Sequence, residues 1–131
     1  MKISAVIPYW SGYLFPEGNL KLRDEVKLGG RSLIDYSVDL LAKANEIDRI
    51  FIYSSDKKIM NLITDQNICT HIQREVNLDN QNVSIETIIK AFLTKNDADI
   101  IILMHPKNPF LSINTLSMCI NAVKTGKYDS A

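Results

Sequence analysis

The chain begins with an apolar run that passes directly into a loop, in the stretch Val6-Ile7-Pro8-Tyr9-Trp10-Ser11-Gly12-Tyr13-Leu14-Phe15-Pro16-Glu17-Gly18-Asn19. The β-branched residues of the run predict a strand over Ile3–Ile7, which Pro8 ends. A loop at the carboxyl end of a strand is the place where open α/β sheets bind ligands. The bulky residues of the loop, from Tyr9 to Phe15, also favour an apolar lid or contact surface. Both interpretations remain open.

Beyond this loop, short apolar runs alternate with helical patterns, as in βαβ units. We therefore predict a single domain over 1–131 with a three-layer α/β/α fold and a mostly parallel sheet. The most hydrophobic run, Asp99–Met104, should be its central strand, covered on both faces. Tyr128–Ala131 resembles the lead into a further strand, so we expect a sheet cut short at its carboxyl end. The other predicted elements are strands at Arg49–Ser54 and Cys69–Ile72, and helices from Ser32 to about Ala44, after Asp56, after Ser84 to Leu93, and over Asn114–Lys124.

Composition narrows the class of protein. The 131 residues are 46% hydrophobic, and 15 basic residues balance 15 acidic ones, so no charge surplus favours nucleic acid or anionic lipid as a partner. The longest apolar run, Ile100–Met104, is far too short to span a membrane, and no signal peptide is recognisable. We expect a cytoplasmic protein. Cys69 and Cys119 have no nearby Cys or His at metal-ligand spacing, which predicts small buried side chains rather than metal ligands.

The carboxyl ends of the predicted strands select four segments for chemistry. They are the loop after Pro8, the turn Ser54-Ser55-Asp56, the polar loop Gln73–Asn82 that contains Arg74, and His105–Leu111. No G-x-G-x-x-G or G-x-x-x-x-G-K-[ST] sequence occurs, which argues against dinucleotide-binding and P-loop proteins.

A series of short motifs has a different match. In order along the chain it reads Ile7-Pro8-x-x-Ser11-Gly12, Pro16-x-x-Asn19-Leu20-Lys21, Gly29-Gly30-Arg31-Ser32-Leu33-Ile34, Ser54-Ser55-Asp56, Arg74, Ser84 and Pro106-x-x-Pro109. This series resembles the amino-terminal part of the acylneuraminate cytidylyltransferases, the CMP-sialic acid synthetases. The resemblance implies a Rossmann-like fold of the nucleotide-diphospho-sugar transferase type. It also implies that CMP is transferred from CTP to an acidic sugar, with Mg²⁺ as cofactor and pyrophosphate as product.

The resemblance places Ser11, Gly12, Asn19, Lys21, Arg74, Ser84 and His105 at the nucleotide. It assigns no catalytic residue and no metal ligand within this chain. Simpler roles stand beside several of these. Arg74 could be a surface residue paired with Glu75 or Asp79. Ser84 and Asp56 could be helix caps alone, His105 could bond local backbone, and Lys57-Lys58 fits a solvated face.

The departures from the family define the alternative. Its loop Arg falls on Trp10, its two Lys near Leu14 and on Gly18, and a later Arg on Leu111. The loss of these cations favours a degenerate member that acts as a nucleotide-binding or protein-interaction module through its apolar loop. A third hypothesis is a relative that uses another nucleotide. The apolar loop and an open sheet edge also favour a homodimer.

Overall fold

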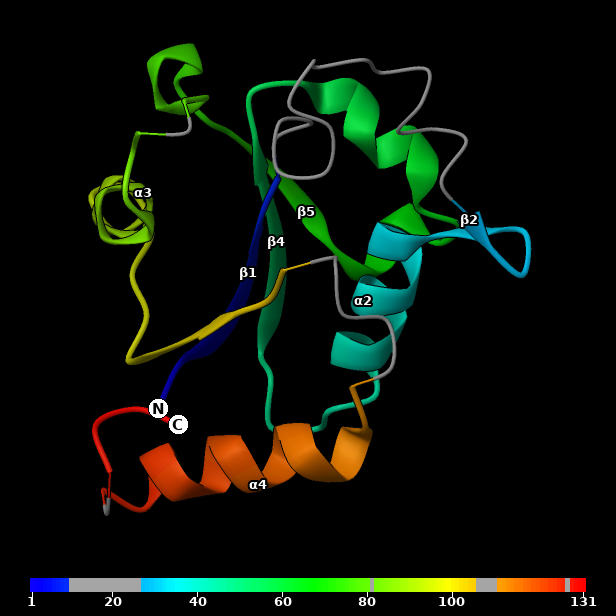
Figure 1. Cartoon of the computed structure of the whole chain (residues 1–131). Coiled ribbons are helices and arrows are strands. Elements are labelled where there is room, and N and C mark those ends of the chain that lie inside the picture. The colour runs from blue at the N-terminus through cyan, green and yellow to red at the C-terminus, as the bar shows by residue number, and fades with distance from the viewer. Residues whose placement is uncertain (10–26, 81, 106–110, 127) are drawn as a thin grey trace.

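A parallel sheet forms the centre of the described chain, and helices cover it on both faces (Figure 1). This computed structural model describes residues 1–9, 27–80, 82–105, 111–126 and 128–131. The strand order is β5-β4-β1-β6, and all three pairings are parallel. The strands are β1 (Ile3–Pro8), β4 (Arg49–Ser54), β5 (Thr70–Gln73) and β6 (Ile100–Leu103). Of the nucleotide-site predictions, Ser11, Gly12, Asn19 and Lys21 lie outside the described residues, as do Trp10, Leu14, Gly18 and Pro106–Pro109.

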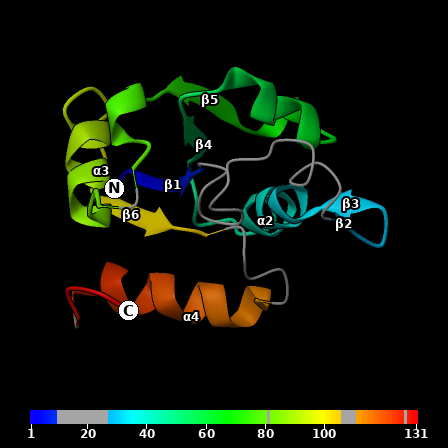
Figure 2. The same cartoon turned by 45° about the horizontal axis from the view of Figure 1, so that its top comes forward.

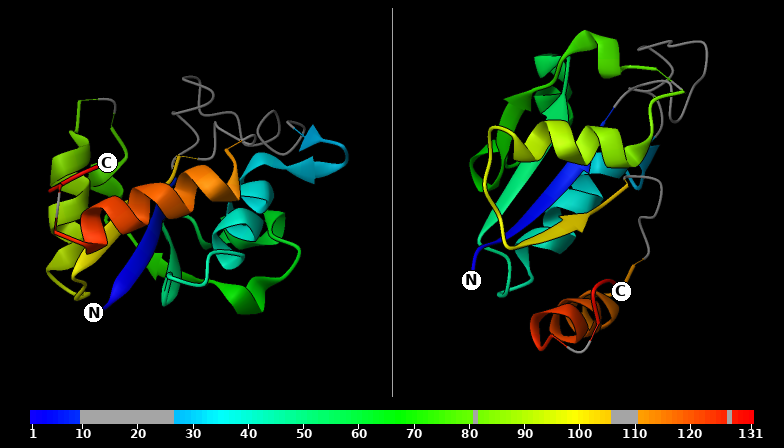
Figure 3. Two further views of the ribbon diagram at one scale, coloured as in Figure 1. Left: turned by 90° about the horizontal axis from the view of Figure 1, so that it is seen from below. Right: turned by 90° about the vertical axis from the view of Figure 1, so that its left-hand side faces the viewer.

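The helices divide between the two faces because β1 is buried on both of them. Ile3, Ala5 and Ile7 share one core cluster with α2 (Leu33–Ala42) and α4 (Ile113–Lys124). Val6, on the opposite face, clusters with Ile88 and Phe92 of α3 (Ile85–Leu93). Figure 2 shows the strands lying between α3 and α2, and the right-hand view of Figure 3 shows β6 between α3 and α4. This is the predicted three-layer α/β/α architecture.

Two predicted helix starts are confirmed in atomic detail. The Ser32 hydroxyl accepts from the Asp35 backbone N–H at 3.2 Å and begins α2, and the Asp56 carboxylate accepts from Lys58 N–H at 2.9 Å. The segment after Asp56 is nevertheless a 3₁₀-helix, η2 (Lys57–Leu62), rather than the α-helix implied by its apolar spacing. Six residues give too few α-helical turns to outweigh the packing of Ile59 and Met60 into the core.

Four short elements of the described chain lie outside the predicted set. Gly29 and Gly30, with φ of 61° and 83°, turn the chain between β2 (Lys27–Leu28) and β3 (Arg31–Ser32), a small antiparallel hairpin. The 3₁₀-helices η3 (Gln66–Ile68) and η4 (Val76–Leu78) flank β5. Cys69 is buried as predicted, and burial raises its thiol pKa, whereas Cys119 is only half-buried. Both are free thiols. No helix among the described residues is long and apolar enough to cross a membrane.

The predicted central position of Asp99–Met104 is wrong. Among the described strands β6 pairs only with β1, and it lies at the edge of the sheet. Its residues are half-buried, and Leu103 is 37% exposed. The interior strands are β4 and β1, and β1 is the less conspicuous in the sequence because Ser4 and Ala5 interrupt its large side chains. Hydrophobicity measures how much of a strand is to be covered, and not which neighbours cover it.

Two aspartates fix the amino end of β1. Asp48 accepts from the Ile3 N–H at 2.7 Å, and Asp99 accepts from the Lys2 N–H at 2.6 Å. These carboxylates stand just before β4 and β6, so they align the starts of three neighbouring strands. The opposite, carboxyl ends of the strands are where the loops predicted to hold a ligand emerge.

Candidate functional site

Polar groups from three neighbouring strands converge at the carboxyl end of the sheet. Tyr9 follows β1 and donates its N–H to Tyr53 O at 3.1 Å, while Arg74 follows β5 and donates its N–H to Ser54 O at 2.9 Å. The ladder thus continues one residue beyond β1 and β5 and holds both residues beside the end of β4. Tyr9, Ser54 and Arg74, which belong to three of the four predicted segments, therefore meet at the carboxyl edge of the sheet, whereas His105 follows β6 on the other side of β1.

Arg74 is the most buried charged side chain described, with 1% of its surface exposed. Its Nη2 donates to the Tyr9 carbonyl at 3.2 Å and to Asp79 Oδ1 at 2.5 Å. Its guanidinium carbon lies 5.8 Å from the centre of the Tyr53 ring. The sequence alternative of a surface residue paired with Asp79 is thus half right: the partner is correct, but the side chain is enclosed.

Two nitrogens of this guanidinium, Nε and Nη1, are buried and have no hydrogen-bond partner in the described part of the chain. A buried donor without an acceptor costs about 1–3 kcal/mol. Stable proteins rarely retain such donors without a use for them. Their position at the carboxyl edge of a parallel sheet points to an acceptor on a bound molecule.

A second polar cluster lies beside this one, at the turn after β4. The Ser54 hydroxyl donates to Asp56 O at 2.7 Å, accepts from Asp56 N–H at 3.1 Å, and lies 3.3 Å from His71 Nε2. Burial lowers the pKa of His71, so its ring is neutral at pH 7. The cluster fixes the path of the turn Ser54-Ser55-Asp56 and brings Ser55 toward the Arg74 loop.

Among the described residues, no hydrogen bond joins the other candidates to Arg74. Ser84 is the exposed cap of α3, and its hydroxyl accepts from the Thr87 N–H at 3.2 Å, as its simpler interpretation predicts. His105 is exposed after β6, at the other edge of the sheet from β5. Lys57 and Lys58 are exposed, as expected for a solvated face.

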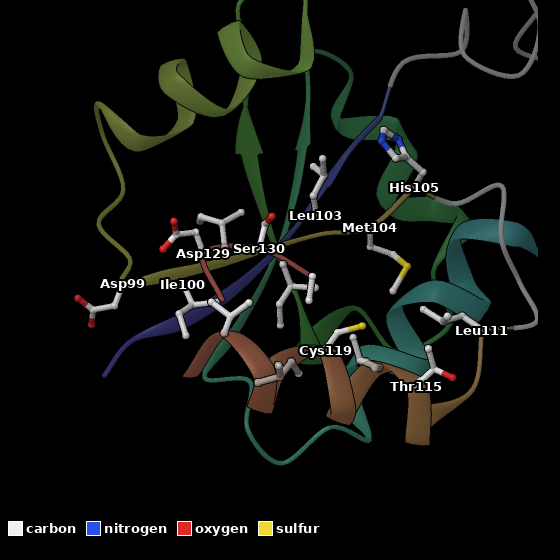
Figure 4. A pocket seen from close by; sticks show the side chains of 16 residues that line it. Asp99, Ile100, Leu103, Met104, His105, Leu111, Thr115, Cys119, Asp129 and Ser130 are labelled. Carbon is white, nitrogen blue, oxygen red and sulfur yellow. The ribbon is translucent and has the colours of Figure 1, made fainter. Parts of the chain in front are cut away.

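A mostly apolar groove of about 620 Å³ lies elsewhere, between β6 and α4. Figure 4 shows the Met104 side chain pointing toward α4, which carries Cys119 and Thr115, while Leu103 points away from α4 and His105 lies at one end of the groove. Of the predicted site residues it includes His105 alone. Its walls offer a ligand little polar recognition, so the Arg74 cluster is the better candidate for binding a nucleotide.

A smaller polar pocket of about 200 Å³ adjoins the β3–α2 junction. Asp35, 4% exposed, accepts there from Arg31 Nε at 3.0 Å and from Thr64 through both its N–H, at 3.0 Å, and its hydroxyl, at 2.7 Å. Burial alone would raise the pKa of Asp35, but the bonds from Arg31 and Thr64 outweigh it, and the pKa is lowered. Since every bond on this carboxylate comes from the fold itself, its role is structural.

We expect Asp35→Ala to lower the free energy of unfolding at pH 7 by about 1–3 kcal/mol, mainly because the Thr64 N–H loses its acceptor. Arg31 adds little, since 38% of its side chain is exposed. A carboxyl whose pKa is lowered by folding stabilises above its unfolded pKa of about 3.9 and ceases to as it becomes protonated. In urea titrations, the difference in free energy of unfolding between wild type and variant should therefore become smaller below about pH 4. A difference that stays constant from pH 7 to pH 3 would contradict this role.

The described residues do not suit a divalent cation. They include no group of three or more His, Cys, Asp or Glu side chains that could hold a metal ion. Near Arg74, both oxygens of Asp79 already accept hydrogen bonds from this chain, one from Arg74 and one from Ser55. We therefore derive no step through Mg²⁺ here.

Sequence reasoning missed the part that Asp79 and Ser55 play beside Arg74. Asp79 entered only as a surface partner, and Ser55 only as part of a turn motif. The available signal was the run of short polar residues that follows Arg74, because such a loop folds back where its side chains find partners.

Comparisons with known proteins bear on the family and the fold of the chain. A sequence model of the family described as "Cytidylyltransferase" matches residues 21–131. No curated protein sequence matches the chain.

Three solved structures share the fold. CMP:2-keto-3-deoxy-manno-octonic acid synthetase, complexed with CTP, has a TM-score of 0.74 at 12% identity, over 97% of this chain and 49% of that one. The 4-diphosphocytidyl-2C-methyl-D-erythritol synthase of Anaerococcus prevotii has 0.64 at 19%, over 94% and 51%. Mycobacterium tuberculosis Rv0371c in complex with manganese has 0.67 at 12%, over 95% and 61%. The chain thus spans about half the length of the first two and less than two thirds of the third.

Proposed function

The chain belongs to the cytidylyltransferase family, and on that premise we propose that it forms the nucleotide-binding part of an enzyme that transfers CMP from CTP to an acidic sugar of the sialic acid type. The family match supports the nucleotide and the transfer. The motif series described above supports the sugar. The observation that carries the proposal is Arg74, whose buried Nε and Nη1 have no hydrogen-bond partner among the described residues and lie at the carboxyl edge of the sheet. The relative that was solved in complex with CTP has the same fold.

In the proposed reaction a hydroxyl oxygen of the sugar forms a bond to the α-phosphorus of CTP. The bond from that phosphorus to the bridging oxygen of the β-phosphate breaks, pyrophosphate leaves, and the hydroxyl proton passes to solvent. Transfers of this kind depend on positioning and on electrostatic stabilisation. The part that we assign to this chain is positioning: Arg74 donates hydrogen bonds that fix the nucleotide against the strand ends.

Calorimetric titration of the chain with CTP, UTP, GTP and ATP tests the binding step. We expect CTP to bind at least about tenfold more tightly than the purine nucleotides, a difference of about 1.4 kcal/mol. Equal affinity for all four, or no heat with any of them, would contradict a cytidylyltransferase nucleotide site. Pyrophosphate release with CTP, Mg²⁺ and a panel of nonulosonic acids then tests the transfer, in the longest form of the protein that can be expressed.

The alternative function is an interaction module that uses the apolar first loop. It is favoured by Trp10, Leu14 and Gly18, which stand where the family has cations. Concentration-dependent dimerisation that is lost in Trp10→Ser, together with absent CTP binding, would support this alternative over the enzyme. The homodimer, the Mg²⁺ requirement, the single-domain boundary at 1–131 and the cytoplasmic location stay predictions.

A further inference from the structure

Asp79 links the loop after β5 to the turn after β4. Its Oδ1 accepts from Arg74 Nη2 at 2.5 Å, and its Oδ2 accepts from the Ser55 hydroxyl. Only 13% of its side chain is exposed. The carboxylate therefore ties the loop that follows β5 to the end of β4. Gln73 adds to this tie, because its side-chain amide donates to Ser55 O at 2.7 Å.

The same carboxylate determines how Arg74 can act. It takes one hydrogen of Nη2, the Tyr9 carbonyl takes the other, and the guanidinium is held from two sides. Because Ser55 takes Oδ2, the ion pair uses a single guanidinium nitrogen, and Nε and Nη1 are left over. Without Asp79, the Tyr9 carbonyl would be the one described hydrogen-bond acceptor of the guanidinium, beside its packing on the Tyr53 ring.

The net charge of the Arg74–Asp79 pair also determines which part of a ligand the pair suits. A buried Arg and a buried Asp in contact are together neutral, and a neutral pair attracts a distant phosphate much less than an isolated cation does. Its free N–H groups still suit uncharged acceptors such as carbonyl oxygens and ring nitrogens. The pair is built to read the nucleoside portion of a nucleotide.

We propose that Asp79 is a positioning residue of the nucleotide site, which aims the free N–H groups of Arg74 and makes Arg74 a reader of uncharged nucleoside acceptors rather than a cation for phosphate. This inference rests on the proposed function. It adds the residue that orients Arg74 and the portion of the ligand that the pair contacts.

The test compares cytidine with CTP on the wild-type chain and on Asp79→Asn, by calorimetry at constant ionic strength. Asparagine keeps a neutral acceptor for Arg74 Nη2, so the bond that orients the guanidinium becomes weaker, and cytidine binding should weaken severalfold. CTP binding should weaken less, because Arg74 now carries an uncompensated charge that attracts the triphosphate. The ratio of the two dissociation constants, cytidine over CTP, should therefore rise severalfold.

Two further variants make the result specific. Asp97→Asn removes the same charge at an exposed position before β6, at the amino end of the sheet, and should leave both affinities unchanged. Ser55→Ala removes the bond to Oδ2 and keeps the charge of Asp79, so it should weaken both ligands by the same small factor with no change in their ratio. Thermal melting accompanies each variant. If Asp79→Asn does not fold, Ser55→Ala still decides, because unchanged cytidine affinity there would overturn the proposal.

Three outcomes would overturn the inference. In Asp79→Asn, unchanged affinities would show that Asp79 does not position Arg74. An equal loss for both ligands would show a merely structural role, and stronger CTP binding with unchanged cytidine binding would make Arg74 a phosphate cation. If the folded wild-type chain binds neither ligand, the proposed function fails, and this inference fails with it.

Discussion

Replacing Arg74 with methionine should weaken CTP binding by about 10- to 100-fold, because hydrogen bonds to a charged donor contribute about 1.5–3 kcal/mol. Methionine fills much of the same volume and removes the buried donors that have no partner. The same change leaves the Asp79 carboxylate, 13% exposed, without its ion-pair partner, so the melting temperature should fall as well. Affinity is therefore measured by calorimetry at a temperature at which melting shows the variant to be folded.

Arg74→Lys is the informative companion variant. Lysine keeps a positive charge beside Asp79 but has no planar array of five N–H groups, so its CTP affinity should fall nearly as far as that of Arg74→Met. Arg49→Met serves as the matched control, since Arg49 is an exposed residue at the amino end of β4. Wild-type affinity in Arg74→Met, or an equal loss in Arg49→Met, would remove Arg74 from the site.

The burial of Arg74 explains why its role was only half predictable from sequence. Charged residues are mostly exposed, so a lone Arg in a polar loop favours a surface interpretation. What encloses it is tertiary: the Tyr9 carbonyl, 65 positions earlier in the chain, and the Tyr53 ring at the end of another strand. Such partners have no local sequence signal, whereas the parallel topology that brings them together was predictable from alternating apolar runs.

Local chemistry was predictable where it depends on neighbouring residues. Ser32, Asp56 and Ser84 all cap helices as their spacing indicates. The bonds that the Asp35 carboxylate accepts from Thr64 were not predictable, because Thr64 lies 29 positions away in the sequence. The edge position of β6 was missed for a related reason, since a run of Ile residues reports its own apolar surface and not its place in the strand order.

The attachment of α3 to the sheet should depend chiefly on Phe92, and Phe92→Ala should lower the free energy of unfolding by about 3–5 kcal/mol. Phe92 is 1% exposed, and its ring centre lies 5.4 Å from that of Phe51 and 5.3 Å from that of Tyr53. Small domains are stable by only about 5–15 kcal/mol, so this loss is a large part of the total. It also removes support from the Tyr53 ring on which the Arg74 guanidinium packs.

Urea denaturation followed by circular dichroism measures the effect, with Leu93→Ala as the control on the same helix. Leu93 is 41% exposed, so its truncation should cost less than about 1 kcal/mol. If Phe92→Ala is too unstable to purify, Phe92→Leu takes its place. We expect its free energy of unfolding to be lower than that of Leu93→Ala, with the protein still folded. Equal destabilisation by Phe92→Ala and Leu93→Ala would mean that the buried face of α3, which contacts Tyr53, does not hold the helix on the sheet. Arg74 would then pack on a Tyr53 ring that Phe92 does not support.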